Sequence, residues 1–378
     1  MSPIKDVICI DFEFRPFGRA EGNPIEVICM VAHRSSTEEY FQLWGDELYA
    51  LKEPPFPIGP DTMLVAYYAS AEMTCFRALS WPWPARVLDL YAEFRNLSNG
   101  LPLVHGRSLL GAQKFFGIPA IDSEYKESMR ALALRGGDYT TSERKALLEY
   151  CQSDVDSLRL LLEAMGNNID YPRAFLRGSY SVPLALMEST GCPIDSGIYV
   201  DLVNHWSSIK DALVRRIDAD YGVYEAGTFK ESLFEEYLTR SGMNRWPRHP
   251  TGRLKLDEET FKEMARAHPQ IQPLRQLRDS LSKLRLNALQ VGFDGRNRCL
   301  LSPYGSSTGR NQPSTNRFVF GLARWARGLI RPKPGTAIAY IDWSQQEFGI
   351  AAALSGDKNM QAAYLSGDPY LEFAKQAD

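Results

Sequence analysis

The chain has 378 residues, enough for two or three domains that each bury a core. Its 44% hydrophobic and 24% charged content is that of an ordinary soluble protein, and no apolar run approaches the ~20 residues of a membrane span. The six cysteines form no CxxC pair, which predicts reduced thiols and argues against a zinc site. A net charge of −3 would argue against a nucleic-acid partner if that charge were evenly spread.

Residues 1–172 alternate strand and helix signals. Apolar runs predict strands at 7–14, 25–32, 40–44, 63–68 and 86–90. Helical periodicity predicts helices at 71–79, 108–115 and 142–165. Because the strands come first and the helices are interleaved later, we expect an α/β fold, with a mixed sheet flanked by helices.

The first predicted strand carries two acids, Asp11 and Glu13, in an otherwise apolar run. Side chains two residues apart emerge on the same face of a strand. Two neighbouring carboxylates in an apolar setting repel each other and are costly to desolvate, and a divalent cation between them removes both problems. The pair therefore indicates metal chemistry. The alternative is that both acids lie at the exposed end of the strand and have no function.

The predicted helix 142–165 contains Tyr150 and Asp154, which are four residues apart and share one face. A phenol one turn from a carboxylate can hold a water molecule while the carboxylate holds a metal ion. Glu72 follows a predicted strand and lies at the start of the helix 71–79. Taken alone, Glu72 is explained as an acid that is favourable in the first turn of a helix.

The order of these acids, DxE on the first strand, one acid after a later strand and YxxxD on the last helix, resembles the tyrosine-containing branch of the DnaQ-like 3′–5′ exonucleases. The resemblance implies a ribonuclease-H-like fold in which Tyr150 orients the attacking water. It also implies two divalent ions, Mg²⁺ or Mn²⁺, held by Asp11, Glu13, Glu72 and Asp154. Hard oxygen ligands suit these two metals. The second motif of the family usually ends in Asp, often with Asn and Phe before it, where this chain reads Tyr68, Ala71 and Glu72.

Residues 173–290 have a mostly helical pattern. An apolar stripe recurs there every three or four residues, at Leu274, Leu277, Leu281, Leu284 and Ala288. Arg275, Arg278 and Arg285 lie off this stripe. They are either ordinary solvated charges or part of a surface that binds phosphates.

Residues 295–341 contain no Asp or Glu and carry a charge of +8, so the other 331 residues together carry −11. The basic residues of this segment are Arg296, Arg298, Arg310, Arg317, Arg324, Arg327, Arg331 and Lys333. Such a patch in an acidic protein is expected of a surface that binds a nucleic-acid backbone. The alternative is a solvated basic surface.

A further apolar run predicts a strand at 336–341 that leads into Asp342. An acid at the end of a strand can bind a metal ion or cap the following helix. Residues 342–347 read DWSQQE and residues 354–357 read LSGD, which resembles motif A of the family A DNA polymerases. Residues 307–310 resemble the TGR segment of that family, and residues 187–195 resemble the opening of its polymerase module. The residues of these motifs are most similar to those of bacteriophage-type members of the family.

The resemblance implies an exonuclease domain at 1–172, a helical thumb-like region at 173–300 and a partial palm at 301–378. Asp342 is then expected to bind a palm metal, and Glu347 to lie against the sugar of the incoming nucleotide. The DNA backbone is expected to contact Arg275, Arg278, Arg285, Arg296, Arg298, Arg310 and Arg317. The implied function is replication of DNA with proofreading of mispaired 3′ ends.

The fingers helix and the second palm carboxylate of the family do not occur before residue 378, so we expect this polypeptide alone not to polymerise. Its partners are expected to be DNA and, in a complete polymerase, deoxynucleotides, with no membrane and a cytoplasmic location in a bacterial or phage-infected cell. Two alternatives remain: a DNA-binding remnant without activity, and a stand-alone exonuclease that acts on RNA.

Overall fold

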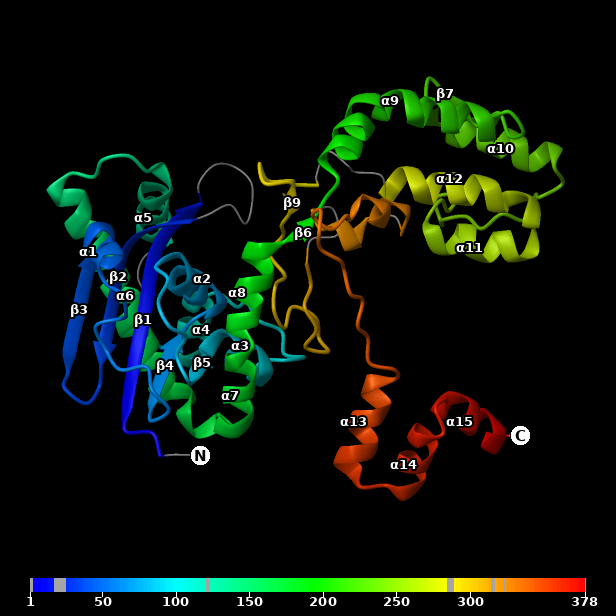
Figure 1. Cartoon of the computed structure of the whole chain (residues 1–378). Helices are drawn as coiled ribbons and strands as arrows, with labels where there is room; N and C mark the ends of the chain where they lie inside the picture. Colours follow the sequence, from blue (N-terminus) through cyan, green and yellow to red (C-terminus); the bar gives the residue numbers. More distant parts are fainter. Residues whose placement is uncertain are drawn as a thin grey trace. The chain divides into compact units, whose positions relative to one another are not determined.

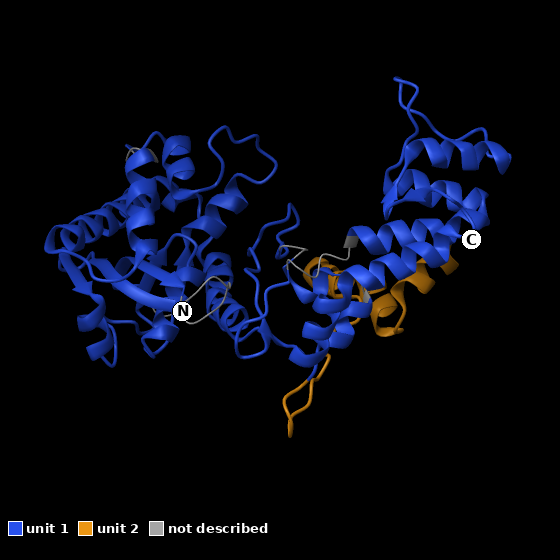
Figure 2. Cartoon of the chain, turned by 90° about the horizontal axis from the view of Figure 1, so that it is seen from above, with its two compact units in different colours: residues 1–331 blue, residues 332–378 orange. Residues whose placement is uncertain are grey.

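The computed structural model describes residues 3–16, 25–119, 123–283, 289–313, 317–322 and 324–377. The chain divides into two compact units, residues 1–331 and residues 332–378 (Figure 2). The predicted domain boundaries after residues 172 and 300 both fall inside the first unit and stay predictions.

A five-stranded mixed sheet forms the first part of the chain (Figure 1). Its order is β3-β2-β1-β4-β5, with antiparallel pairing among β1, β2 and β3 and parallel pairing among β1, β4 and β5. The strands are β1 (Asp6–Pro16), β2 (Ile25–Arg34), β3 (Glu39–Trp44), β4 (Thr62–Ala66) and β5 (Val87–Asp89). This confirms the expected mixed sheet with flanking helices.

Six helices accompany the sheet. They are α1 (Gly45–Ala50), α2 (Ser70–Ala78), α3 (Leu90–Leu97), α4 (Leu109–Phe116), α5 (Ser123–Arg135) and α6 (Thr141–Met165). The longest, α6, begins at a capping box in which the Thr140 hydroxyl accepts from the N–H of Glu143 and the Glu143 carboxylate accepts from the N–H of Thr140.

Alternation along β1 divides the apolar core between the two faces of the sheet. Ile8, Ile10 and Phe12 pack in one cluster with residues of α2, including Met73. Cys9 belongs to the other cluster, which is built largely from residues of α6. The odd-numbered side chains of β1 therefore face α6.

The rest of the first unit is mostly helical, as expected. Its helices are α7 (Tyr171–Ser179), α8 (Ser181–Thr190), α9 (Ser196–Asp218), α10 (Glu231–Arg240), α11 (Glu258–Ala267) and α12 (Gln272–Lys283). Its short strands are β6 (Cys192–Pro193), β7 (Tyr224–Glu225), β8 (Thr228–Phe229) and β9 (Arg296–Asn297), and 3-10 turns occur at Gly166–Asn168, Pro269–Ile271, Val319–Gly321 and Arg324–Leu329. A separate apolar cluster around Phe234, Trp246 and Phe261 holds α10, α11 and α12 together.

The second unit consists of α13 (Gln346–Ser355), α14 (Lys358–Leu365) and α15 (Pro369–Ala377). The strand predicted at 336–341 is wrong, because these residues are irregular. A strand needs a neighbour to satisfy its backbone, and among the described residues none pairs with this segment. Its apolar side chains are accordingly exposed, with Tyr340 at 86% and Ile341 at 83%. Throughout the part of the chain that the structure describes, no helix has both the length and the apolarity to cross a membrane.

Candidate active site

The two acids of β1 lie beyond the part of the strand that pairs with β4. Parallel pairing with β4 ends at Cys9, whereas antiparallel pairing with β2 continues to Pro16. Asp11 and Glu13 occupy odd positions, so both are on the face that α6 covers. Beyond Cys9, the edge of β1 that faces β4 has no paired strand among the described residues, and α2, the helix after β4, contacts β1. This part of the sheet therefore has room for groups from α2 and α6 around the two acids.

Helix α6 supplies three side chains to this place. Tyr150, Cys151 and Asp154 are all buried. The Cys151 thiol donates to the Asp11 carboxylate at 3.3 Å and to the Asp11 carbonyl oxygen at 3.2 Å. The Tyr150 hydroxyl lies near enough to Asp154 for that carboxylate to raise its pKa. The YxxxD spacing thus brings the phenol and the carboxylate together on the side of α6 that faces β1.

Glu72 reaches the same place from the first turn of α2. Its side chain is 4% exposed, and its Oε2 has no hydrogen-bond partner among the described residues. The turn before α2 is tight, since Tyr68 has a φ of 72°, which is uncommon for a bulky residue. The Asp89 carboxylate holds this turn by accepting from the Tyr68 N–H at 3.0 Å. The turn points a buried carboxylate toward the acids of β1.

The charges of these acids act on one another. Burial, the largest cause, and then the charge of Asp154 raise the pKa of Asp11 to about 7. Burial and the charge of Asp11 raise the pKa of Glu13 well above its usual range. Burial and the charge of Asp11 likewise raise the pKa of Glu72 well above its usual range. Burial and the charge of Asp154 also raise the pKa of the Tyr150 hydroxyl. The five predicted residues of the nuclease motif are thus near enough for their charges to act on one another, with Glu72, Tyr150 and Asp154 buried and Asp11 and Glu13 half-buried. We call these five residues the acid cluster.

The chemistry of the acid cluster suits a hard divalent cation, because the cluster offers four carboxylates. One oxygen of these carboxylates, Oε2 of Glu72, is buried and has no hydrogen-bond partner among the described residues. The cluster is not already arranged as a coordination site. Within the described ranges, no three His, Cys, Asp or Glu residues are placed to hold one metal ion together. The Asp154 carboxylate is instead paired with Lys126, whose Nζ lies 2.9 Å from Oδ2.

Two residues of this site were missed by sequence reasoning. Cys151 lies inside the YxxxD motif, and its place one residue after Tyr150 could have marked it as a neighbour of the acids. Lys126 gave no signal, because a lysine on a polar helix usually faces solvent. Only the packing of α5 against β1 and α6 brings its ammonium group to Asp154.

Two of the arginines that sequence reasoning assigned to DNA are engaged within the protein. The Arg298 guanidinium is paired with Asp294, at 2.6 and 2.8 Å, and donates to the carbonyl oxygen of Ser189. Arg296 donates to the carbonyl oxygens of Thr190 and Gly191. Both side chains brace the bend after α8 where β6 pairs with β9, and their contact with DNA stays a prediction.

The other predicted arginines lie in varied surroundings. Arg278 is partly buried, with its guanidinium over the rings of Phe229 and Phe261, and burial lowers its pKa. Arg275 lies on the same helix, α12, whereas Arg285 lies outside the described residues. Arg310 and Arg317 are exposed. These exposed side chains are accessible to a large ligand such as a nucleic acid.

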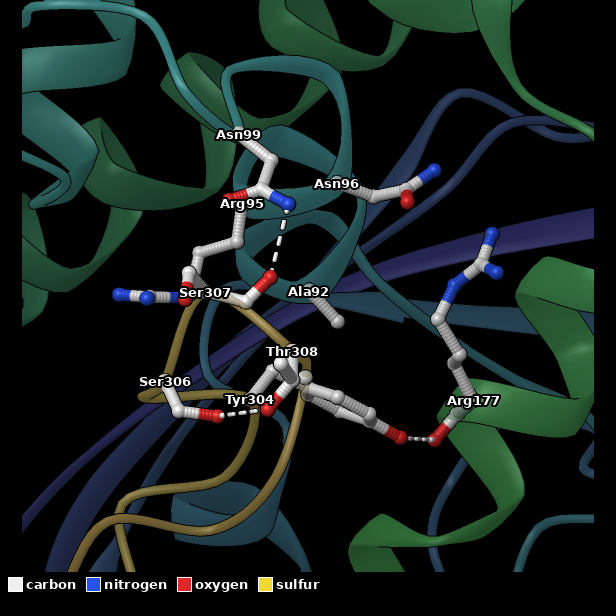
Figure 3. Close-up of a pocket in the computed structure, with 10 residues that line it drawn as sticks. Ala92, Arg95, Asn96, Asn99, Arg177, Tyr304, Ser306, Ser307 and Thr308 are labelled. Atoms are coloured by element: carbon white, nitrogen blue, oxygen red, sulfur yellow. Dashed lines mark hydrogen bonds between the residues drawn. The ribbon is translucent and has the colours of Figure 1, made fainter. Parts of the chain in front are cut away.

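The loop before Arg310 is tethered to the end of α3 and to α7 and borders a cavity of about 340 Å³ (Figure 3). Asn99 donates to the carbonyl oxygen of Ser307 at 2.9 Å. Arg95 donates to that of Gly305 at 2.7 Å, and the Tyr304 hydroxyl donates to the carbonyl oxygen of Arg177 at 2.9 Å. These contacts hold together residues that are between 127 and 210 positions apart in sequence.

In the second unit, the two predicted polymerase residues are close in sequence and exposed. Asp342 lies in the irregular segment and Glu347 in the first turn of α13. Among the described residues of this unit, no group of three metal-ligating side chains surrounds either of them. Their roles stay predictions.

Asp89, which caps α3, gives a testable pH dependence. Burial raises its pKa to about 6 although backbone N–H groups of Tyr68 and Tyr91 act in the opposite direction. The native state thus binds more protons than the unfolded state between about pH 4 and about pH 6, and the stability from this group is lost as the pH rises through that range. Asp89→Asn keeps an acceptor without a charge. We expect it to flatten this part of the profile, as measured by thermal unfolding at pH 5 and pH 8. A variant destabilised more at pH 8 than at pH 5 would contradict this assignment.

Comparisons with known proteins agree with this architecture. No protein-family model matches the sequence, and a search of curated proteins finds no match. Among solved structures, a match is the POL domain of Pol1 from M. smegmatis in complex with DNA primer-template and dNTP, with a TM-score of 0.59 and 15% sequence identity. The match covers 94% of this chain and 61% of that chain, so this chain spans less than two thirds of it. At this identity the likeness shows the fold, and the fold of this chain is polymerase-like.

Proposed function

We propose that this chain belongs to a family A DNA-directed DNA polymerase of bacteriophage type and that its first 172 residues are a 3′–5′ proofreading exonuclease. The observation that carries the proposal is the acid cluster, which joins two acids of β1, one of α2 and the Tyr150–Asp154 pair of α6. The strand order β3-β2-β1-β4-β5, with its antiparallel and parallel halves, supports the ribonuclease-H-like fold that this activity implies.

The assigned cofactor is Mg²⁺ or Mn²⁺, held by Asp11, Glu13, Glu72 and Asp154. When bound, a pair of such ions lowers the pKa of water and stabilises charge on the attacking and leaving oxygens of a phosphodiester. Tyr150 is a neutral phenol at neutral pH, and burial raises its pKa further, so its hydroxyl can donate to or orient a water beside Asp154. Cys151 holds Asp11 toward the same point.

DNA is the proposed substrate and partner. The M. smegmatis domain was solved with DNA primer-template and dNTP, and this chain shares its fold. The exposed Arg310 and Arg317 lie in the acid-free segment 295–341 and are assigned to contacts with backbone phosphates. Asp342 and Glu347 are assigned to the palm metal and to the sugar of the incoming nucleotide.

The test is digestion of single-stranded DNA by the full chain, with the label at the 3′ end in one reaction and at the 5′ end in another. A 3′–5′ exonuclease releases the 3′ label at once as a mononucleotide and converts the 5′-labelled strand into a descending ladder, in Mg²⁺ or Mn²⁺ but not in excess chelator. Absence of digestion with either metal would contradict the proposal and support a DNA-binding remnant. An RNA strand of the same sequence, degraded faster than DNA, would support the stand-alone ribonuclease.

Tyr150→Phe tests the role of the phenol. We expect kcat to fall about 10- to 100-fold, because an attacking water that is no longer oriented reacts from a poorer geometry. Mn²⁺ affinity should stay the same, since the carboxylates are untouched. The control is Tyr125→Phe, whose ring packs edge-on against Tyr150 with centroids 6.4 Å apart. An equal loss in both variants would show that the effect is not specific to the Tyr150 hydroxyl.

A further inference from the structure

Lys126 makes direct contact with two residues of the acid cluster. Its Nζ donates to both carboxylate oxygens of Asp154, at 3.1 and 2.9 Å. The same nitrogen lies over the Tyr150 ring, 5.6 Å from the ring centroid. Tyr125, the neighbour of Lys126 on α5, packs edge-on against that ring. The beginning of α5 therefore covers the Tyr150–Asp154 face of α6.

The position of Lys126 suits it to balance the negative charge of the cluster. Asp11 and Glu13 are each repelled by Asp154, and Glu72 is repelled by Asp11 and Glu13. Lys126 acts against this repulsion at Asp11 and at Glu13. Arg130, one helical turn further along α5, also acts on Glu13. Helix α5 thus presents two cations to the acid cluster, and Lys126 is the one in contact with Asp154.

The contact is placed so that it can be released. The Lys126 side chain remains 32% exposed, whereas that of Asp154 is 11% exposed. A flexible four-carbon stem lets the ammonium group move into solvent without a shift of α5. As long as it stays, both oxygens of Asp154 accept from a cation of the protein, which competes with a metal ion for them.

We propose that Lys126 is a positioning residue that serves as an internal counter-ion of the acid cluster: it holds Asp154 beside Tyr150 when no metal is bound, and a divalent metal must displace it from Asp154 to bind. This inference rests on the proposed metal-dependent function and deepens it, because it makes metal affinity a property set partly by α5.

The test is the affinity of the full chain for Mn²⁺ in the absence of DNA, measured by titration calorimetry, together with the unfolding temperature without metal. We expect Lys126→Met to bind Mn²⁺ about tenfold more tightly, since a hydrogen bond to a charged group is worth at least that factor. Without metal the variant should melt at a lower temperature than the wild type. Lys126→Arg, which keeps a cation for Asp154, should stay near the wild-type affinity.

The matched control is Lys145→Met, which removes the same group from an exposed pair with Glu149 on α6 and should leave Mn²⁺ affinity unchanged. In the background of Asp154→Asn the gain from Lys126→Met should disappear, as expected for a pair that acts through one contact. If Lys126→Met does not fold, Lys126→Gln takes its place.

The outcomes separate this inference from the proposed function. Wild-type Mn²⁺ binding with DNA digestion, combined with unchanged or weaker binding by Lys126→Met, overturns the role of Lys126 alone. Binding by Lys126→Met but not by the wild type supports the displacement. Absence of Mn²⁺ binding in both proteins, without digestion, overturns the metal-dependent function and the role of Lys126 together.

Discussion

Joint replacement of Asp11 by Asn and Glu13 by Gln is expected to lower the rate of DNA digestion by about a thousandfold or more. Both side chains lie on the face of β1 that meets α6, and metal catalysis of phosphodiester cleavage is worth several kcal/mol, with each 1.4 kcal/mol equal to a factor of ten. The rate is measured as release of a 3′ label under single-turnover conditions.

The loss should not come from unfolding. Because burial and repulsion raise the pKa of both acids, neutral replacements relieve an unfavourable charge and should leave the metal-free protein at least as stable at pH 8. The control is Glu258→Gln with Glu259→Gln, which removes two exposed charges from the first turn of α11. Digestion by the Asp11/Glu13 double variant at a tenth of the wild-type rate would rule out the assigned site.

Gly178→Ala is expected to destabilise the first unit by about 3 kcal/mol or more. Helix α7 packs against β5 so closely that a Cβ on Gly178 would lie 1.9 Å from the carbonyl oxygen of Val87. Both contacting groups belong to regular backbone, which cannot yield as a side chain does, so the helix would have to move away from the sheet. Urea denaturation, followed by circular dichroism, measures the change in free energy of unfolding.

The matched control is Gly328→Ala, because a Cβ at Gly328 would meet no atom within 4 Å. That variant should change the free energy of unfolding by less than about 1 kcal/mol. A Gly178→Ala variant as stable as the control would show that α7 is not packed on β5 as described. Displacement of α7 should also disturb the ion pair of Arg177 with the buried Glu93, whose atoms lie 2.6 and 2.7 Å apart.

The sheet and the long helix could be predicted from the sequence because their signals are local. An apolar run with two acids specified β1, and a three-to-four residue periodicity specified α6 to within one residue. The predicted strand 336–341 had the same kind of local signal, but a strand is stable only when another strand pairs with it. At 336–341 the local pattern therefore showed only that these residues favour a strand, and not that a strand forms.

The candidate site was predicted in part for a similar reason. Spacing placed Tyr150 and Asp154 on one helix face, which depends only on helix geometry. The contact of Lys126 with Asp154 depends on how α5 docks, and no short pattern records it. Charge counting likewise overlooked that Asp294, one residue before the acid-free segment, is the partner of Arg298.

The pairing of β6 with β9 has a consequence for the helices between them. Cys192 is opposite Asn297, and the Ile194 N–H donates to the carbonyl oxygen of Gly295 at 2.8 Å. The chain thus leaves this two-stranded base and comes back to it after a hundred residues, and the helices α10–α12 have a core of their own. Because, among the described residues, this core shares no buried residue with the clusters around β1 and α6, a change in it should cost little in the packing of the sheet.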